Sequence, residues 1–382
     1  MSQTPQTQQI AMVAGEASGD LLASLLIPSL QQQWPGVQLH GIGGPRMNAL
    51  GFESWWPVSK LAVRGYVEVL KHYREIVGIR RQLKQRLLNN RPHLFIGVDA
   101  PDFNLDLAKD LRQQGIPTVQ FVCPSVWAWR AERLQKIRNS VDHVLCLFPF
   151  EPALLAQHGI AATFVGHPIA HTIPDQVDKG PVRAALGLDE NDLVLTLMPG
   201  SRQSEIAQLA PVFLQAAKLL QQQHPKLRVL LPVAPGLMAA VQAHLQYSGL
   251  KNIRLLDGQS HAALGAADLV LVASGTATLE AALFKRPMVI AYKMPWLSWQ
   301  ITNRKRLQAW VGLPNILCQD FVVPELLQDA ATPQAMANAL QHWLDHPEQV
   351  NHLQQAFQDL HQSLKQDMSS LARHALQKII AA

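Results

Sequence analysis

Short apolar runs alternate along the chain with stretches in which apolar residues recur every three or four positions. The apolar runs fall at residues 10–15, 94–101, 118–125, 143–150, 193–200, 228–235, 269–276 and 287–292. Runs of this length are typical of buried strands, and the amphipathic patterns at 21–33, 104–114 and 205–223 are typical of helices. Strands that alternate with helices predict parallel, doubly wound sheets of the α/β class.

The alternation is interrupted between residues 171 and 182. This segment, HTIPDQVDKGPV, is rich in the Pro, Asp and Gly residues that mark loops. A length of 382 residues also suits two domains. We predict a first domain over 1–170, a linker over 171–182, a second domain over 183–350 and a helical tail over 351–382. Open parallel sheets bind ligands beyond the carboxyl ends of their strands, so we expect the domains to face each other across a cleft.

Composition narrows the class of protein. Hydrophobic residues make up 48% and charged residues 16%, as expected of a globular chain. The N-terminal residues lack the order of a signal peptide, and no apolar stretch is long enough to span a bilayer. The cysteines, Cys123, Cys146 and Cys318, form no CxxC pair, which argues against a disulfide framework and a zinc site. We expect a cytoplasmic protein. Its net charge of +5 suits nucleic acid, an anionic membrane or phosphorylated substrates.

Two turns in the predicted second domain each join a strand to a helix. They are Gly200-Ser201-Arg202 and Ser274-Gly275-Thr276. Glycine lets a backbone approach a ligand closely, and the free N–H groups of a helix N-terminus favour an anion, to which Arg202 adds a forked contact. Glu280, one turn into the second helix, could accept from ribose hydroxyls. The alternative is that both are ordinary tight turns, with Glu280 on a solvated face.

The loop after the first strand of the chain carries Glu16, Ser18, Gly19 and Asp20. Carboxylates repel phosphate and accept from hydroxyl groups, so this loop suits a sugar better than a pyrophosphate. Ser18 or Asp20 could instead cap the helix that follows. The nearby GIGGPR lacks the final Gly of GxGxxG, so we predict no dinucleotide site there.

Asp99 ends a wholly apolar run and is followed by Pro101. A carboxylate at a strand end could take the proton of an attacking hydroxyl, which contributes about 10²–10⁴-fold to a rate. The alternative is that Asp99 or Asp102 caps the next helix, and Asp102 suits that structural role better.

The string PSVWAWR follows another strand and presents Trp127, Trp129 and Arg130. Two Trp residues two positions apart cannot share one face of a helix. A loop with apolar walls beside an Arg suits a sugar or an acyl group, although either Trp could equally pack in the core. The chain lacks GxxxxGK[ST], HExxH and a clean DxD. We therefore expect no P-loop and no catalytic metal, and we interpret His167 and His171 as structural.

An apolar stripe with basic neighbours covers residues 63–77. Its apolar members are Val63, Tyr66, Val67, Val69, Leu70, Tyr73, Ile76 and Val77. Arginines and lysines lie among and after them between Arg64 and Arg91. This pattern is typical of a helix in a membrane interface, but core packing explains such a stripe more often. A second, weaker candidate lies around Trp296, Trp299 and Trp310.

Five motifs occur in the order VAGEASGD, GVDAPDFN, PSVWAWR, PGSR and ASGTATLE. Together they resemble the lipid-A-disaccharide synthase family over essentially the whole chain. The resemblance implies a GT-B type fold with two Rossmann-like domains, the first binding the acceptor and the second the UDP-sugar. It also implies a membrane-facing segment near 61–80, peripheral association with the cytosolic face of the inner membrane, and a homodimer that exchanges its C-terminal parts.

The resemblance further implies a reaction. UDP-2,3-diacylglucosamine would transfer its sugar to 2,3-diacylglucosamine 1-phosphate (lipid X) with inversion, giving a β-1,6-linked disaccharide 1-phosphate and UDP without a cofactor. The family pattern places its Asp on Asp99, its loop Arg on Arg202 and an Asn of the active-site cleft on Asn315.

Three alternatives remain open at the level of sequence. One is a UDP-sugar epimerase on the same fold, which would need no acyl-binding surface. Another is a non-catalytic protein that binds lipid or nucleotide. The third is a nucleic-acid binder, which we disfavour because the basic residues lie beside an apolar stripe and no recognised reading motif is present.

Overall fold

The computed structural model describes residues 8–61, 66–128, 132–305 and 307–381. In two helices the side chains of residues 66–73, 297, 298, 301, 302 and 305 lie outside this description. The described residues divide into two compact units. The first comprises the chain up to Pro168 together with the segment from Leu364 onward, and the second comprises Ile169–Ser363.

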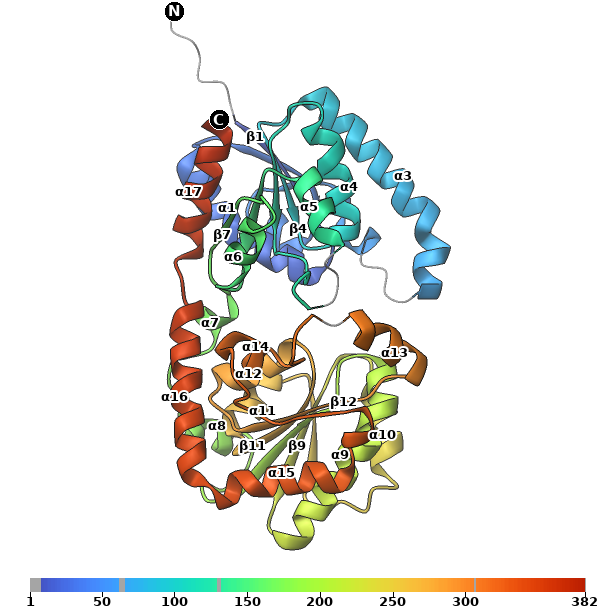
Figure 1. Ribbon diagram of the computed structural model, residues 1–382, viewed down its shortest axis with the longest axis vertical. Helices are drawn as coiled ribbons and strands as arrows, with labels where there is room; N and C mark the ends of the chain where they lie inside the picture. Colours follow the sequence, from blue (N-terminus) through green and yellow to red (C-terminus); the bar gives the residue numbers. More distant parts are fainter. Residues whose placement is uncertain (1–7, 62–65, 129–131, 306, 382) are drawn as a thin grey trace, which may run out of the picture. The chain divides into compact units, whose positions relative to one another are not determined.

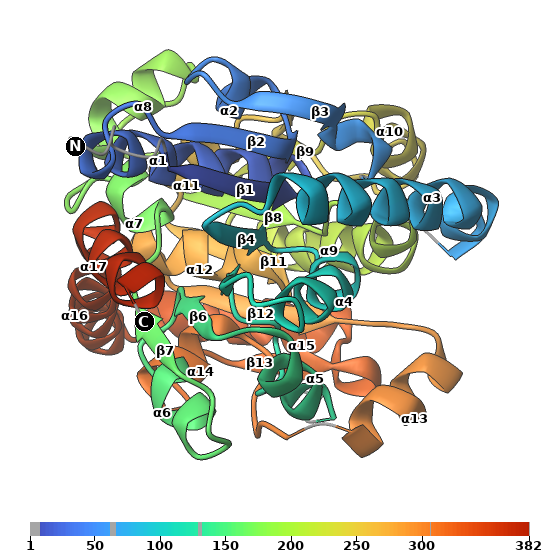
Figure 2. The ribbon, with the colours of Figure 1, turned by 90° about the horizontal axis from the view of Figure 1, so that it is seen from above.

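The first unit is built on a parallel sheet of seven strands in the order β3-β2-β1-β4-β5-β6-β7. The strands are β1 (Gln9–Ala14), β2 (Gln38–Gly43), β3 (Glu53–Pro57), β4 (Leu94–Val98), β5 (Thr118–Phe121), β6 (His143–Cys146) and β7 (Ala162–Phe164). Strand β1 pairs with β2 and β4, so the winding reverses between β1 and β4 (Figure 2). Such a reversal is the point at which open α/β sheets bind ligands.

Helices cover both faces of this sheet. They are α1 (Ala17–Gln33), α2 (Pro45–Asn48), η1 (Val58–Lys60), α3 (Tyr66–Asn90), α4 (Pro101–Arg112), α5 (Arg133–Ser140), α6 (Glu151–Ala156) and α17 (Met368–Ala381). One core lies between the sheet and the helices α1 and α17. The other lies between the sheet and the helices α3, α4 and α5, which Figure 1 shows together on one side of the unit. The strands are therefore apolar on both faces, which explains their continuous hydrophobic runs.

The second unit repeats the plan with six parallel strands in the order β10-β9-β8-β11-β12-β13. They are β8 (Val194–Met198), β9 (Arg228–Val233), β10 (Ile253–Asp257), β11 (Leu269–Ala273), β12 (Met288–Tyr292) and β13 (Glu325–Leu327). Here the winding reverses between β8 and β11. Each unit thus has one reversal, and the predicted α/β class with two doubly wound domains is confirmed.

Helices also cover both faces of the second sheet. They are α7 (Ile169–Thr172), α8 (Lys179–Ala185), α9 (Gln203–Gln223), α10 (Met238–Leu245), α11 (Ser260–Ala266), α12 (Thr276–Leu283), α13 (Trp296–Lys305), α14 (Leu313–Cys318), η2 (Gln328–Ala330), α15 (Pro333–Asp345) and α16 (Pro347–Leu364). Helices α9 and α15 pack together against one face. Helices α8 and α11 pack together, and α11 contacts β8 and β9.

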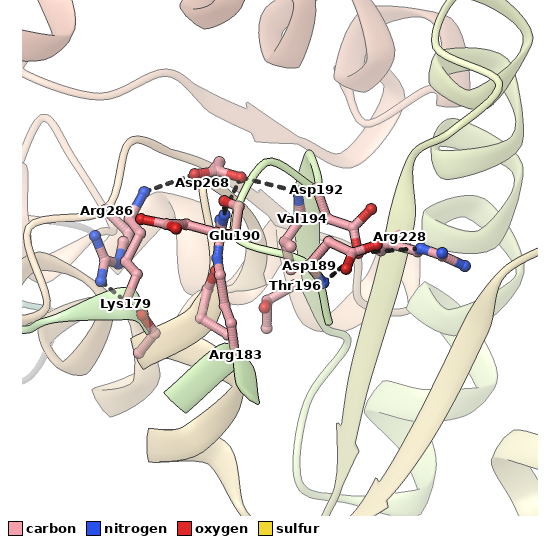
Figure 3. A network of polar contacts seen from close by, with 12 residues as sticks. Lys179, Arg183, Asp189, Glu190, Asp192, Val194, Thr196, Arg228, Asp268 and Arg286 are labelled. Atoms are coloured by element: carbon pink, nitrogen blue, oxygen red, sulfur yellow. Dashed lines mark hydrogen bonds and ion pairs between the residues drawn. The ribbon is translucent and has the colours of Figure 1, made fainter. Parts of the chain in front are cut away.

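The segment expected as a linker contains the start of a helix. Asp178 is the N-cap of α8, and its side chain accepts from the Gly180 N–H at 2.9 Å. The Asp and Gly that suggested a loop therefore begin a helix. Helix α8 is anchored to the sheet through Asp268, whose carboxylate accepts from Lys179 Nζ at 2.6 Å and Arg183 Nη2 at 2.7 Å (Figure 3).

The C-terminal segment also differs from the expected tail over 351–382. Residues up to Ser363 belong to the second unit, whereas α17 packs against α1 and β7 of the first unit. The physical reason is the apolar face of α17. Its residues Met368, Ala372, Ala375 and Leu376 are part of the core that covers β1 and β4.

None of the helices in the described part of the chain combines the length and the apolar character needed to cross a membrane.

Candidate active site

The reversal in the first sheet brings two loops together. The loop after β1 contains Gly15 and Glu16, and the loop after β4 contains Asp99 and Ala100. A Cβ placed on Gly15 would lie 2.2 Å from the Cβ of Ala100, so only glycine permits this approach. These loops follow the carboxyl ends of β1 and β4, where an open parallel sheet is expected to bind its ligand.

Asp99 occupies a strained turn. Its φ is 53° and that of Ala100 is 40°, both in the left-handed region that non-glycine residues seldom adopt. Each such residue costs roughly 1–3 kcal/mol, and strain of this kind gathers at functional sites. Burial raises the pKa of the Asp99 carboxyl above its ordinary value, and the negative charge of Glu16 raises it further, although a backbone hydrogen bond to Ala100 opposes them. A carboxyl that holds its proton more firmly is a stronger base when ionised.

The two carboxylates that follow β1, Glu16 and Asp20, have different surroundings. Glu16 stands at the N-cap of α1 with its side chain making no cap bond, and it lies near enough to Asp99 to act on its charge. Asp20 is buried and accepts from the N–H groups of Gly44 and Met47 at 2.9 and 3.1 Å. Asp20 therefore caps α2, the next helix, rather than its own. Ser18 is exposed and Gly19 is buried beneath the loop.

Trp127 is buried, in agreement with the alternative that this residue packs in the core. Its indole N–H donates to Glu151 Oε1 at 3.1 Å, and its ring meets Phe148 and Phe150 edge-on. Burial raises the pKa of Glu151 to about 7. Contact of Trp127 with an acceptor stays a prediction, and Trp129 and Arg130 lie outside the described residues.

The predicted membrane-facing residues fall in α3. Its backbone is helical from Tyr66, as the stripe predicted. The side chains of Tyr66, Val67, Val69, Leu70 and Tyr73 lie outside the described residues. From Ile76 onward one face of the helix packs on the core: Ile79, Leu83 and Leu87 are buried there, and Ile76 of the stripe is partly buried against them.

The reversal in the second sheet brings together the two predicted turns, because Gly200-Ser201-Arg202 follows β8 and Ser274-Gly275-Thr276 follows β11. At the first turn, Glu205 occupies the position expected of an anion. Its Oε2 accepts from the N–H groups of Ser201 and Arg202 at 2.9 and 3.3 Å. Gly200, at φ 120°, leaves the room that Glu205 fills. These N–H groups are thus bonded within the chain.

The Arg202 side chain remains accessible. Its Nη1 lies 2.7 Å from Glu205 Oε1, yet 73% of the side chain is exposed. An arginine has five N–H donors in a planar fork, so one bond to Glu205 leaves others for a ligand. Glu205 thereby orients Arg202 while it closes the start of α9.

The second turn is open. Gly275 is the N-cap of α12, no side chain caps this helix, and a Cβ on Gly275 would meet nothing within 4 Å. Gly275 and Thr276 are exposed, whereas the Ser274 hydroxyl donates to the Val311 carbonyl at 3.0 Å. Glu280 is largely buried, which raises its pKa, while His261 at 3.7 Å opposes the rise. The N-terminus of α12 therefore offers an accessible position for an anion.

Asn315 is fully buried. Its Nδ2 donates to the Val323 carbonyl at 2.9 Å and to Glu325 Oε1 at 2.8 Å, and its Oδ1 accepts from the Val323 N–H. Glu325 also accepts from the N–H groups of Val311 and Gly312, at the start of α14. In this structure Asn315 therefore orders the loop behind Ser274, and its direct contact with a nucleotide stays a prediction.

Sequence reasoning missed several polar residues at these strand ends. They are Asn104, Gln120, Glu151, Glu205 and Glu325. One signal was available: Gln120 interrupts the apolar run TVQFV, and Asn104 closes the string GVDAPDFN. For Glu151 and Glu325, whose partners include residues ten or more positions away, the sequence carried no local signal, whereas Glu205 forms a local capping box with Arg202 that we did not predict.

No group of three or more His, Cys, Asp or Glu side chains in the described parts of the chain is placed to hold a metal ion.

The fold places the chain in a class shared by glycosyltransferases and UDP-sugar epimerases. A UDP-GlcNAc 2-epimerase from Neisseria meningitidis matches with a TM-score of 0.66 at 12% identity, covering 97% of this chain and 100% of that chain. A glycosyltransferase from Rickettsia africae matches with a TM-score of 0.59 at 10% identity, covering 98% of each chain. Identities this low show the fold alone.

Sequence similarity identifies the family. A family profile described as "Lipid-A-disaccharide synthetase" matches residues 10–380. The lipid-A-disaccharide synthase of Albidiferax ferrireducens is 60% identical over 99% of both chains, and that of Burkholderia thailandensis is 50% identical over 100% of this chain and 98% of its own. The chain belongs to the lipid-A-disaccharide synthase family. It is a glycosyltransferase of lipid A biosynthesis, and the epimerase and non-catalytic alternatives are set aside.

Proposed function

We propose that the chain joins UDP-2,3-diacylglucosamine to lipid X. The products are the β-1,6-linked disaccharide 1-phosphate and UDP. The observation that carries this proposal is membership of the lipid-A-disaccharide synthase family over residues 10–380. The substrates' negative charges also fit the net charge of +5.

In the proposed reaction, the 6-hydroxyl oxygen of lipid X attacks the anomeric carbon of the donor. The bond from that carbon to the UDP oxygen breaks, the configuration inverts, and the hydroxyl proton passes to the Asp99 carboxylate. Support comes from the position of Asp99 at the sheet reversal and from its raised pKa. Glu16, Ser18 and Gly19 of the neighbouring loop would contact the acceptor sugar, and Trp127, Trp129 and Arg130 its remaining surface.

The departing diphosphate needs positive charge as its bond to the sugar breaks. The exposed N-terminus of α12, at Gly275 and Thr276, supplies N–H groups and the positive end of a helix dipole. Arg202, held by Glu205, supplies a forked cation. Preorganised groups of this kind are usually the largest single contribution to catalysis. Glu280 would accept from the ribose hydroxyls.

We further propose that the protein is cytoplasmic and associates peripherally with the cytosolic face of the inner membrane through the first turns of α3. Support comes from the apolar stripe and basic residues of 63–91. The proposal predicts that Val69→Ser with Leu70→Ser weakens binding to vesicles of anionic phospholipid, whereas Tyr247→Ser, at an exposed aromatic residue of the second unit, does not. Equal binding by both variants in a flotation assay would contradict it.

Incubation of the purified protein with both substrates, in detergent, tests the proposed reaction. We expect mass spectrometry to detect the disaccharide 1-phosphate, with or without EDTA, and neither substrate alone to yield it. Folded protein that forms no disaccharide would overturn the substrate assignment.

A further inference from the structure

Two side-chain amides meet at the main-chain carbonyl of Asp99. Asn104 Nδ2 donates to it at 2.9 Å and Gln120 Nε2 at 3.0 Å. The Asp99 N–H donates to the Phe121 carbonyl of β5 at 2.9 Å. Both amide side chains are fully buried. The main chain of Asp99 is therefore held both at its N–H and at its carbonyl, in the latter case by two buried side chains.

The same amides also hold the ends of neighbouring strands. Asn104, in the first turn of α4, donates to the carbonyls of Val13 in β1 and Val98 in β4 at 3.2 and 3.4 Å. Gln120, in β5, donates to the Val122 carbonyl at 3.4 Å. The two amides thus link the ends of β1, β4 and β5 to the turn that carries Asp99.

Stability alone does not account for these amides. Asn104 Oδ1 and Gln120 Oε1 are buried without a hydrogen-bond partner among the described residues, and a buried acceptor without a partner destabilises a fold. A Cβ on Gly97 would lie 2.8 Å from Asn104 Cβ and 3.0 Å from Gln120 Oε1, so Gly97 provides their space. Apolar side chains of the same shape would bury no unpaired side-chain oxygen, but they would leave the Asp99 carbonyl without these two donors.

The turn that the amides hold is strained. Asp99, Ala100 and Val122 have φ values of 53°, 40° and 78°, and Val122 is β-branched, which makes a positive φ a true outlier. Such conformations persist only where the surroundings determine them. The direction of the Asp99 side chain follows from this backbone conformation.

We propose that Asn104 and Gln120 are positioning residues, which fix the direction of the Asp99 carboxylate by holding the Asp99 carbonyl. The inference rests on the proposed role of Asp99 as the base. Neither amide needs to touch a substrate. A misplacement of a reacting group by about 1 Å can cost about 10²-fold in rate, so loss of either amide should act on turnover.

Single variants of similar size, Gln120→Met and Asn104→Leu, test the proposal, with Asn104→Ser as a smaller replacement. We expect kcat to fall by about 10–10²-fold with KM changed by less than about twofold. Thr118→Val is the matched control: Thr118 is fully buried at the other end of β5 and donates to the Ser140 carbonyl at 3.2 Å. It should lose stability while keeping kcat.

The pH profile of kcat separates positioning from general loss of structure. The other carboxylates on the elements around Asp99 are Glu16 and Asp20, which is bonded to α2, and three aspartates of α4. Of these, Asp102 pairs with Arg133 at 2.7 Å, Asp106 with Arg80 at 2.8 Å and Asp110 with Lys84 at 2.8 Å. None of them changes in the variants. A carboxylate turned in another direction has a different burial and a different distance to Glu16, so the acid limb of the profile should move. An unmoved limb, with kcat losses no larger than that of Thr118→Val, would overturn the proposal.

Asp99→Asn separates this inference from the proposed function. If Asp99 is the base, Asp99→Asn loses turnover, and Gln120→Met added to it causes no further loss. Wild-type turnover in Asp99→Asn would refute the role of Asp99 and the inference with it. Loss of turnover in Asp99→Asn but wild-type kcat in Gln120→Met and Asn104→Leu would refute the positioning role alone.

Discussion

Asp99 bears a charge where the fold disfavours one. Burial and the charge of Glu16 both raise its pKa, so between the ordinary value for Asp and the raised value the folded chain holds a proton that the unfolded chain has released. The free energy of unfolding therefore falls as pH rises through that window. Above it, ionised Asp99 destabilises the fold, as expected of a site that trades stability for activity.

Asp99→Asn should consequently improve stability while it removes activity. We expect turnover to fall by about 10²–10⁴-fold, because the base is lost. We expect the melting temperature to rise at pH 7 and to converge with that of the wild type at pH 3, where Asp99 is protonated in both states. Assays and thermal unfolding at both pH values measure this. A lower melting temperature at pH 7 would show that the charge stabilises the fold.

Arg202→Ala should lower kcat/KM by about 10²–10³-fold, the usual effect of removing one donor to a developing anion. Its side chain is 73% exposed, so the melting temperature should change little. The control is Arg228→Ala, which should keep full activity. Arg228 is the first residue of β9 and pairs with Asp192 at 3.3 Å. Equal activity in the two variants would contradict the role of Arg202.

At the residue scale, the sequence located strand-end groups better than it defined their contacts. Asp99 and the α12 turn lie at sheet reversals because strand order places them there. In contrast, Asn315 and Trp127 bond to Glu325 and Glu151, residues that the sequence did not connect with them. Contacts of this kind depend on packing between distant segments, which no local pattern encodes.

At the scale of elements, the strand ends opposite the proposed chemistry carry a partly buried ion network. Figure 3 shows Asp268 between Lys179 and Arg183, and its Oδ2 also accepts from the Val194 N–H at 2.9 Å. Arg286 lies beside them and donates to the Leu264 carbonyl at 2.9 Å. Burial lowers the pKa of Arg286 to about 10. Without Asp268, two cations would remain without their shared partner.

Asp268→Asn should therefore destabilise the second unit by about 3 kcal/mol, the low end for breaking a buried pair, because Lys179 stays partly exposed. Thermal unfolding measures the loss, and the folded fraction should keep the wild-type kcat. Asp192→Asn, which affects the pair with Arg228, should cost about 1 kcal/mol or less. Equal losses in both variants would contradict the central place of Asp268.

The predicted elements were more reliable where apolar runs were long. The run at 94–101 became β4, whereas β2, with the sequence QLHGIG, was not predicted, and neither were β3, β7, β10 and β13. Polar residues and glycine dilute the pattern in β2, although His40 and Gly41 are buried there. The loop signal at 171–182 holds for residues 173–178, whereas the segment from Lys179 belongs to α8, which Asp178 begins.

At the scale of the whole molecule, the end of the chain completes the core of the unit in which the chain begins. Leu376 in α17 is fully buried in the core that includes α1 and β4. The expected homodimer with exchanged C-terminal parts stays a prediction. Exchange would seat the α17 of a second chain on α1 with the same contacts, so we propose light scattering on the purified protein as its test.

Leu376→Ala should destabilise the first unit by about 2–5 kcal/mol, as large-to-small changes in a core do. Lys378→Ala, at an exposed position of the same helix, should change stability by less than about 0.5 kcal/mol. Urea unfolding measures both. A small effect of Leu376→Ala would show that α17 is dispensable to this core.

The central claim is that the chain transfers a sugar from UDP to lipid X with Asp99 as base. The most direct measurement is the rate of UDP release from UDP-2,3-diacylglucosamine, with and without lipid X, for the wild type and Asp99→Asn. We expect the wild type to release UDP only when lipid X is present, in equal amount to disaccharide, and Asp99→Asn to lose about 10²–10⁴-fold of this rate. Release that is independent of lipid X, or unchanged in Asp99→Asn, would contradict it.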